Sequence, residues 1–148
     1  MNESPRRFLL RAAALLPLAG LAWSPGVKAQ AASTKPHRVV IQVTDNDPAR
    51  WNLVLNNTRN VQEDLGAANV DVEIVAYGPG INMLKSDSAV GSRIDEALKA
   101  GVKVVACQNT MRGLKLTPQD MLPTIGYVPA GVTEIMKKQG EGWAYLRP

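Results

Sequence analysis

Runs of β-branched residues alternate with apolar residues at helical spacing along most of the chain. Three runs predict strands: residues 38–44 (RVVIQVT), 70–77 (VDVEIVAY) and 102–107 (VKVVAC). Residues 125–128 and 143–146 predict two shorter strands. Between these runs, apolar residues recur every three or four positions, which is typical of one face of a helix. The pattern therefore predicts strands and helices in alternation.

The helices expected after the first and second strands have recognisable ends. Asp47-Pro48 forms a helix start, with the carboxylate as the cap and the proline in the first turn, and Gly66 ends this helix. A second long helix is expected to begin at Asp87 or Ser88 and to end at Gly101. The residues expected to face the core are Trp51, Val54, Leu55, Thr58, Val61 and Leu65 in the first helix and Val90, Ile94, Ala97 and Leu98 in the second.

Two shorter helices complete the pattern. Residues 117–120 have the form of a capping box that opens a short helix. The last helix ends at Gly140, and its expected apolar face is Val132, Ile135 and Met136. Strands that alternate with helices about every twelve residues indicate a mainly parallel sheet covered on both faces. The expected fold is therefore α/β, a three-layer α/β/α sandwich with a sheet of about five strands.

The first residues have the parts of a cleavable export signal. Three arginines in residues 6–11 supply the positive start, and the apolar run of residues 12–23 is shorter than the roughly 20 residues of a membrane-spanning helix. Ala29-Gln30-Ala31 offers small residues at both positions that signal peptidase reads, so we expect cleavage after Ala31. Arg6-Arg7-Phe8-Leu9-Leu10 also resembles the twin-arginine export pattern, so both export routes stay open.

The expected cleavage divides the chain into three parts and sets its compartment. Residues 1–31 are the signal peptide, residues 32–37 a mobile leader and residues 38–148 the folded domain. At about 117 residues, the mature chain fits one domain. We expect it in the periplasm, without a stable membrane anchor after cleavage.

Removal of the signal also changes the charge of the protein. The whole chain has 17 basic and 13 acidic side chains and a net charge of +4, whereas 13 basic and 12 acidic side chains remain after Ala31. The net charge of the mature chain, 13 − 12 = +1, gives no reason to expect a nucleic acid as a partner. The single cysteine, Cys107, and the single histidine, His37, exclude an intramolecular disulfide and a Cys/His metal cage within one subunit. We expect no metal and no cofactor.

Polar residues follow the carboxyl ends of three expected strands, the edge where open parallel sheets bind ligands. Cys107 is the strongest candidate for a reactive residue, because it ends an apolar strand and precedes polar residues that can expose backbone amides. If a helical turn begins near Asn109, its amides and the Arg112 side chain would favour the thiolate over the thiol. The other residues expected around the thiol are Thr110 on the same segment, Tyr77, Gly78 and Gly80 after the second strand, and Asn46 after the first.

Each candidate also has a purely structural interpretation. Cys107 could be a buried small apolar residue at a strand end, and Gly78-Pro79-Gly80 an ordinary turn, without the spacing of a nucleotide-binding loop. Asp47 is better explained as a helix cap than as half of an acid pair. Cysteine-hydrolase chemistry is not expected, because it normally needs a histidine beside the thiol and His37 lies at the start of the domain.

Five segments of the chain carry a family resemblance through their order and spacing. They are VVIQVTDNDPARWNLVLNN, VEIVAYGPGINML, VKVVACQNTM, VPAGVTEI and WAYLRP. With these segments, residues 38–148 resemble the DsrE/DsrF-like family. The resemblance implies a DsrE-like fold and members that assemble as dimers, trimers or hexamers, so a homo-oligomer is expected. Trp143 and Tyr145 share one face of the last strand, which could be core or a patch where subunits meet.

The resemblance also implies a function. In relatives that traffic sulfur, a cysteine at the ligand-binding edge accepts and passes on a persulfide sulfur without a metal or an organic cofactor. Cys107, in its C-x-N-T-M setting, matches that position. The function implied is a sulfurtransferase-like carrier with a protein as sulfur donor or acceptor, although such relays are cytoplasmic. The alternative is a non-catalytic oligomeric binding or accessory protein of the periplasm, in which Cys107 only packs or lines a ligand pocket.

Overall fold

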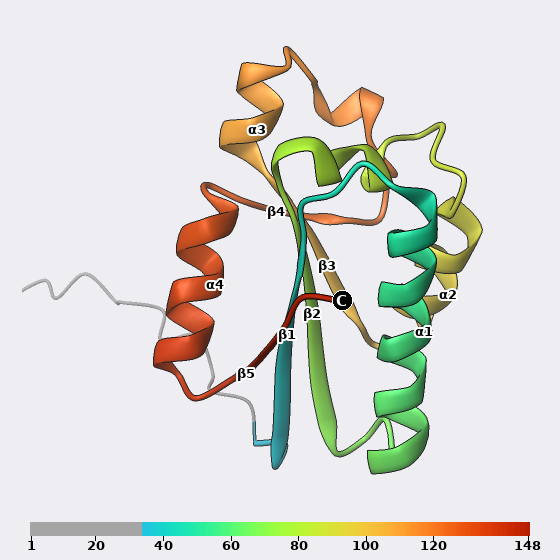
Figure 1. Cartoon of the computed structure of the whole chain (residues 1–148), viewed down its shortest axis with the longest axis vertical. Coiled ribbons are helices and arrows are strands. Elements are labelled where there is room, and N and C mark those ends of the chain that lie inside the picture. The colour runs from blue at the N-terminus through green and yellow to red at the C-terminus, as the bar shows by residue number, and fades with distance from the viewer. Residues whose placement is uncertain (1–33) are drawn as a thin grey trace, which may run out of the picture. The chain divides into compact units, whose positions relative to one another are not determined.

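The computed structural model describes residues 34–148, so the expected signal peptide lies outside the described residues. Five strands form one sheet in the order β4-β3-β2-β1-β5, and each neighbouring pair is parallel (Figure 1). Their bounds are β1 His37–Val43, β2 Val70–Ala76, β3 Lys103–Cys107, β4 Gly126–Val128 and β5 Ala144–Leu146. The prediction of a mainly parallel sheet of about five strands is confirmed.

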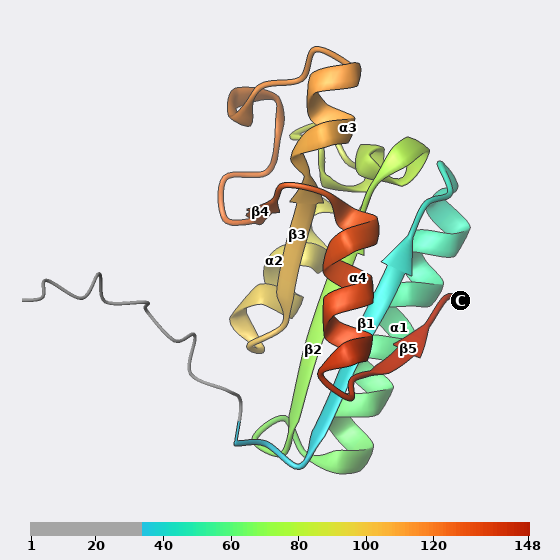
Figure 2. The ribbon, with the colours of Figure 1, turned by 90° about the vertical axis from the view of Figure 1, so that its left-hand side faces the viewer.

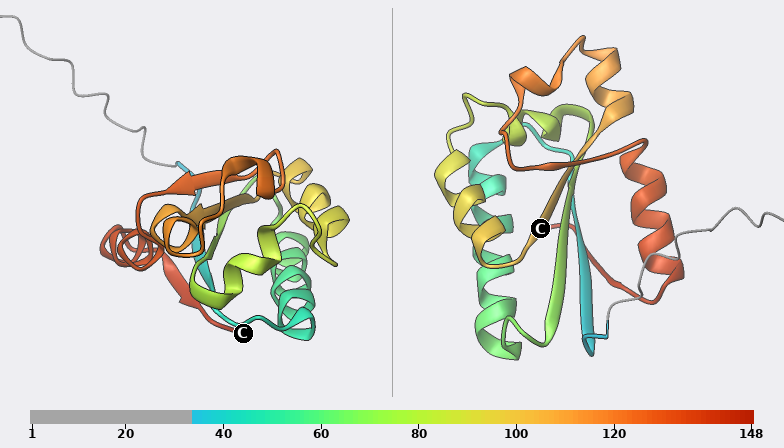
Figure 3. Two further views of the ribbon diagram at one scale, coloured as in Figure 1. Left: turned by 90° about the horizontal axis from the view of Figure 1, so that it is seen from above. Right: turned by 180° about the vertical axis from the view of Figure 1, so that it is seen from behind.

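Helices cover both faces of this sheet. They are α1 Pro48–Leu65, α2 Gly91–Lys99, α3 Gln108–Gly113 and α4 Gly131–Gly140, with two 3-10 helices, η1 Gly78–Leu84 and η2 Pro118–Asp120. α4 runs along one face of the sheet (Figure 2), while α1 and α2 cover the opposite face (Figure 3). The three-layer architecture is therefore confirmed. In the part of the chain that the structure describes, no helix combines the length and the apolar character needed to cross a membrane.

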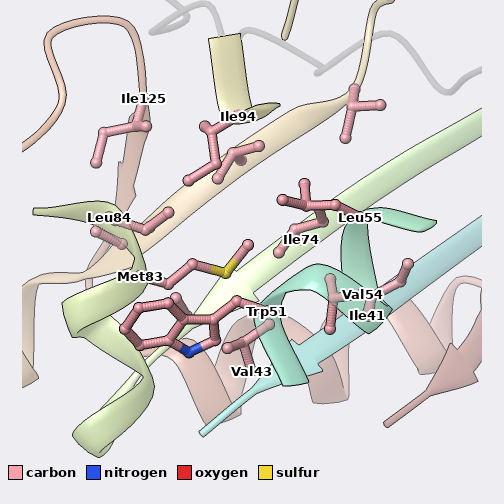
Figure 4. Close-up of a cluster of buried hydrophobic side chains, with 14 of the residues drawn as sticks. Ile41, Val43, Trp51, Val54, Leu55, Ile74, Met83, Leu84, Ile94 and Ile125 are labelled. Carbon is pink, nitrogen blue, oxygen red and sulfur yellow. The ribbon is translucent and has the colours of Figure 1, made fainter. Parts of the chain in front are cut away.

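Alternation along the strands divides the core into two parts. Every second residue of the three central strands points toward α1 and α2, where a large apolar cluster includes Trp51, Met83 and Ile94 (Figure 4). The intervening residues face α4, and three of them, Val40, Val75 and Val105, form a smaller cluster with Val128 of β4 and Ile135 of α4. Full burial of an aliphatic side chain contributes roughly 1.5–3 kcal/mol. The α4 face therefore gains much less from apolar burial than the α1 and α2 face.

The start and the end of α1 agree with the sequence prediction. Asp47 Oδ1 accepts a hydrogen bond from Ala49 N–H at 2.9 Å, and Pro48 occupies the first turn. Gly66 follows the helix with a φ of 83°, a conformation that glycine adopts without strain. Asp47 is thus a helix cap, and the acid pair considered as an alternative has no support.

α2 is shorter than the sequence predicted. It begins at Gly91, not at residues 87–88, and it spans nine residues. The preceding backbone is used in another way, because Lys85 pairs with Met121 in an antiparallel bridge and Leu84 O accepts a hydrogen bond from Leu122 N–H at 2.9 Å. Residues 85–91 then form two successive turns, in which Ser88 N–H donates to Lys85 O at 2.9 Å and Gly91 N–H donates to Ser88 O at 3.1 Å. These turns replace the first turn of the predicted helix, so the predicted start is wrong.

Two residues of the predicted apolar face of α4 point away from the sheet. Ile135 is buried, but Val132 is 54% exposed and Met136 66% exposed. Two charged side chains of the helix, Glu134 and Lys138, are largely buried in their place. The predicted face is therefore wrong for Val132 and Met136.

The folded domain begins slightly before its predicted boundary. β1 starts at His37, and Lys35 Nζ donates hydrogen bonds to the carbonyl oxygens of Ala67 and Val70, each at 3.1 Å. Lys35 and His37 were assigned to the leader by the sequence prediction. Their contacts make both residues part of the folded domain.

Candidate functional site

Cys107 lies at the carboxyl end of β3 with its side chain on the α4 face of the sheet. Strand alternation sets this direction, because Val105, two residues earlier, packs in the α4-side cluster. The residue is 4% exposed and its thiol is free. The chain passes here directly from strand to helix, so the sulfur caps α3 and accepts a hydrogen bond from Thr110 N–H at 3.5 Å.

The Thr110 hydroxyl connects the thiol to the end of β2. Its oxygen accepts a hydrogen bond from Gly78 N–H at 3.0 Å, and the hydroxyl group also bonds to the Cys107 sulfur. One hydroxyl can accept and donate at the same time. Because the Gly78 N–H already donates to the oxygen, the hydroxyl hydrogen can point at the sulfur. Two of the three predicted loop segments therefore meet at the thiol.

The start of α4, which was not among the predicted loop segments, also reaches the sulfur. Gly131, the first residue of α4, directs its backbone N–H at the Cys107 sulfur. Asn109 N–H donates to Pro129 O at 3.2 Å, which ties the start of α3 to the loop before α4. A side chain at residue 131 would not fit, since its Cβ would lie 2.8 Å from Tyr77 Cδ1. Glycine at this position lets the helix start come close to the sheet edge.

These contacts determine the charge state of the thiol. Burial raises the pKa of Cys107, but hydrogen bonds from the Thr110 hydroxyl and from the N–H groups of Thr110, Gly131 and Asn109 lower it by more. The net result is a thiol pKa below the ordinary value for cysteine. The N–H groups belong to the starts of α3 and α4, where the helix dipole also favours an anion. The site can therefore hold a thiolate, which is the nucleophilic form of cysteine.

Tyr77 extends the site toward β1 and β5. Burial raises the pKa of its phenol, Tyr145 and Cys107 raise it further, and Arg147 lowers it in part. Tyr145 in turn donates from its hydroxyl to Gln42 Oε1 at 2.6 Å. The Tyr77 phenol thus stays protonated at neutral pH and adds a neutral polar group near the thiol.

Three of the predicted site residues have other surroundings. Arg112 donates a hydrogen bond to Asn109 Oδ1, so it contacts a neighbour of the thiol. Gly80 packs against β1, where an added Cβ would lie 2.4 Å from the carbonyl oxygen of Val43. Asn46 is an exposed residue of the connection between β1 and α1. The close approach that glycine permits at residue 80 is thus to the backbone of β1 within the same chain.

Gly131 is the site residue that the sequence analysis missed. Its segment was interpreted only as a helix with an apolar face. A signal was present in the sequence, because the strand expected at residues 125–128 ends shortly before Gly131 and parallel strands end at a common edge. In the structure, Cys107 and Val128 pair in register at that edge. The helix that follows β4 must then begin close to the thiol.

Other parts of the described structure offer less for chemistry. A groove of about 180 Å³ lies between α1 and α2, on the sheet face opposite the thiol, and it is lined by residues that include Leu55, Arg59, Arg93 and Ala97. Within residues 34–148, no three His, Cys, Asp or Glu side chains gather as metal ligands would. The sulfur of Cys107 is therefore the reactive group on which a site can be built.

Replacement of Thr110 by valine tests the hydrogen bonds around the sulfur. Valine has nearly the same shape but no hydroxyl, so the sulfur loses one donor and Gly78 N–H loses its acceptor. We expect the thiol pKa to rise and the free energy of unfolding to fall by about 1–3 kcal/mol. Titration of the thiolate absorbance and chemical denaturation measure the two effects. Thr110→Ser keeps the hydroxyl and should preserve the thiol pKa; an equal rise in both variants would contradict the assignment.

Comparison with known proteins gives a family and a fold. A family model described as the DsrE/DsrF-like family matches residues 37–148. Among solved structures, the chain is similar to MTH1491, a protein of unknown function from Methanobacterium thermoautotrophicum. The two share 38% sequence identity and a TM-score of 0.73 over 76% of this chain and 99% of that chain. No curated protein matches the chain.

Two more distant structures support the fold alone. BT1422, a conserved protein of unknown function from Bacteroides thetaiotaomicron, has 18% identity and a TM-score of 0.62, and the match covers 75% of this chain and 94% of that chain. The ychN protein from E. coli has 12% identity and a TM-score of 0.61 over 76% of this chain and 99% of that chain. All three matches extend over nearly the whole of the compared structure.

Proposed function

The chain belongs to the DsrE/DsrF-like family, and on this basis we propose that it carries or transfers persulfide sulfur on Cys107. At the level of the family, the fold is related to sulfur metabolism. The observation that carries the finer proposal is the set of hydrogen-bond donors around the single thiol of the chain. These donors favour the thiolate, the form that attacks a sulfur atom.

The proposed step is an exchange of one sulfur–sulfur bond for another. The Cys107 thiolate attacks the outer sulfur of a persulfide donor, R–S–SH, and forms a new S–S bond. The S–S bond of the donor breaks, and the donor leaves as the thiolate R–S⁻. No external oxidant or reductant is needed, because one S–S bond replaces another. Transfer to an acceptor thiolate repeats the exchange in the other direction.

Burial of Cys107 sets a condition on this chemistry. With the residue only 4% exposed, a donor must displace the groups that cover the sulfur before it can react. An added sulfur extends about 2 Å beyond Sγ. The N–H groups that bond to the thiolate can also bond to a persulfide anion at the same place. The proposal therefore includes a local opening of the site during loading.

Loading with sulfur tests the proposal directly. The purified protein is incubated with a small-molecule persulfide, and mass spectrometry is used to locate the product. We expect one added sulfur atom, located on the peptide that contains Cys107 and removed by a thiol reductant. An unmodified thiol that also resists alkylating reagents would contradict the proposal.

The burial of Cys107 also favours a second candidate, a non-catalytic oligomeric accessory protein. In that role the thiol would only pack. Exposed apolar residues of α4 and β5, such as Met136 and Tyr145, would then serve contacts between copies of the chain. For both candidates we propose a homo-oligomer in the periplasm, the latter on the signal in residues 1–31. The thiol distinguishes them, since only the sulfur carrier needs Cys107 to react.

A further inference from the structure

A carboxylate lies buried in the middle of the sheet, on the face that α4 covers. Glu73 of β2 is fully buried, and its neighbours in the strand register are Val40 of β1 and Lys103 of β3. Its side chain points to the same face as Val75, two residues along the strand. Burial of a carboxylate costs free energy unless cations compensate for it. The apolar packing of the sheet does not explain why a glutamate stands here.

Two lysines compensate for the charge, and they come from different layers. Lys103 Nζ in the sheet lies 3.1 Å from Glu73 Oε2, and Lys138 Nζ on α4 lies 3.3 Å from the same oxygen. The Lys103 side chain is 49% exposed, whereas that of Lys138 is only 13% exposed. The pair of Glu73 with Lys138 is thus the more buried one, and it joins α4 to the sheet.

Further contacts hold the end of α4 at the same place. The Lys138 ammonium lies 4.4 Å from the centre of the Trp143 ring and 3.7 Å from Glu134 Oε1, one turn earlier. Arg38 of β1 lies 5.9 Å from the same ring centre and donates to Glu141 O, just after the helix, at 2.9 Å. Together these contacts hold the carboxyl-terminal part of α4 against β1 and β2.

The amino-terminal end of the same helix lies at the thiol. Gly131 and Ile135 are the buried residues of α4, so the apolar contact between the helix and the sheet is small. Lys138 follows Gly131 by seven residues, which is about 10 Å along a helix axis. Both residues belong to one short helix, which Figure 2 shows running from the carboxyl end of β3 back along the sheet. The contacts of Lys138 at one end of the helix can therefore influence where Gly131 lies at the other end.

We propose that Glu73 is a positioning residue for the Cys107 site. Its carboxylate holds Lys138 and thereby keeps α4 where the Gly131 N–H reaches the sulfur. Glu73 acts through the helix and not on the sulfur itself. The value of this arrangement to the protein rests on the proposed function, but the geometry can be tested on the thiol without any sulfur transfer.

The charge of Glu73 makes this positioning sensitive to pH. Burial raises the pKa of Glu73, Lys103 and Lys138 lower it in part, and Glu134 raises it. A carboxyl with a higher pKa in the folded chain than in the unfolded chain stabilises the fold at low pH. That contribution is lost as the pH rises through the folded pKa. Burial therefore disfavours the ionised form of Glu73, and the two lysines partly compensate for it.

The variant Glu73→Gln tests the proposal, because it keeps the size of the side chain and removes the charge. We expect the Cys107 pKa to rise, so that the thiolate fraction near neutral pH falls about threefold to tenfold, as the loss of one N–H bond to an anion implies. Titration of the thiolate absorbance in the purified full chain measures this fraction. The far-UV circular dichroism spectrum and the thermal unfolding midpoint are measured alongside, and a thiol pKa that rises in a variant still fully folded at the titration temperature separates positioning from a general loss of structure.

Two further variants make the test decisive. Lys138→Met removes the partner of Glu73 on α4 and should raise the thiol pKa, as Glu73→Gln does. Lys103→Met removes the partner in the sheet and changes no residue of α4, so the thiol pKa should stay unchanged. An unchanged thiol pKa in folded Glu73→Gln and Lys138→Met would overturn the proposal. If Glu73→Gln does not fold, Lys138→Met alone decides. A parent protein that takes up no sulfur would count against the proposed function only.

Discussion

Replacement of Cys107 by serine is expected to abolish sulfur loading and to leave the fold intact. The chain contains no other cysteine, so no second thiol can take up the sulfur. The serine hydroxyl is smaller than the thiol and can accept hydrogen bonds from the Thr110 and Gly131 N–H groups that now meet the sulfur. The free energy of unfolding should therefore change by no more than about 1 kcal/mol. Mass spectrometry after incubation with a persulfide measures the loss, and chemical denaturation measures the stability.

The same variant separates the two candidate functions. A sulfur carrier must lose its cellular role with Cys107→Ser even though the protein folds and assembles normally. An accessory protein, in contrast, should keep both its assembly and its role. Size-exclusion chromatography of the variant provides the control for assembly. A serine variant that still takes up one sulfur per chain would contradict the assignment of Cys107.

Replacement of Gly80 by alanine is expected to be the most damaging substitution for stability among those considered. The new Cβ would lie 2.4 Å from Val43 O, 2.6 Å from Val43 C and 2.8 Å from Thr44 Cα. All three are backbone atoms, so no side chain can rotate away to make room. The Val43 carbonyl also accepts a hydrogen bond from Tyr77 N–H at 3.1 Å, so a shift of β1 would strain a second contact. We expect a loss of about 3 kcal/mol or more, measured by chemical denaturation.

Gly140→Ala is the matched control for this prediction. A Cβ at residue 140 meets nothing within 4 Å, and the residue ends α4 in open space. The substitution should be neutral or stabilise the protein by up to about 1 kcal/mol, because alanine favours the helix more than glycine does. If the Gly80 and Gly140 variants proved equally stable, the close packing of η1 against β1 would have to be abandoned.

The parts of the fold that could be predicted from the sequence have local signals. Runs of β-branched residues mark β1, β2 and β3, and Asp47 and Gly66 act on backbone groups within a few residues. The edge that carries the site was also predictable, because parallel strands end at a common edge. Cys107, Thr110 and Gly78 therefore meet where the strand pattern alone suggested.

The parts that could not be predicted depend on which helix covers which face. Glu73 stands in VDVEIVAY as an ordinary polar position, but it lies on the sheet face that α4 covers, and its partner Lys138 comes about 65 residues later in the chain. Helical spacing in α4 suggested a face of Val132, Ile135 and Met136. In the structure Lys138 faces the buried Glu73 instead, and Val132 and Met136 face outward. Electrostatic pairing across layers leaves no periodic pattern in the sequence.

The strand order also has a consequence for how the chain folds during synthesis. One edge of β1 is closed only by β5, whose residues 144–146 pair with residues 39–41. Until the ribosome has made those residues, β1 presents an unpaired edge of Val39, Val40 and Ile41 to its surroundings. Open apolar edges of this kind are where nascent chains stick to one another or recruit chaperones. An export route that transports folded protein can therefore act on this chain only after residues 144–146 have paired with β1.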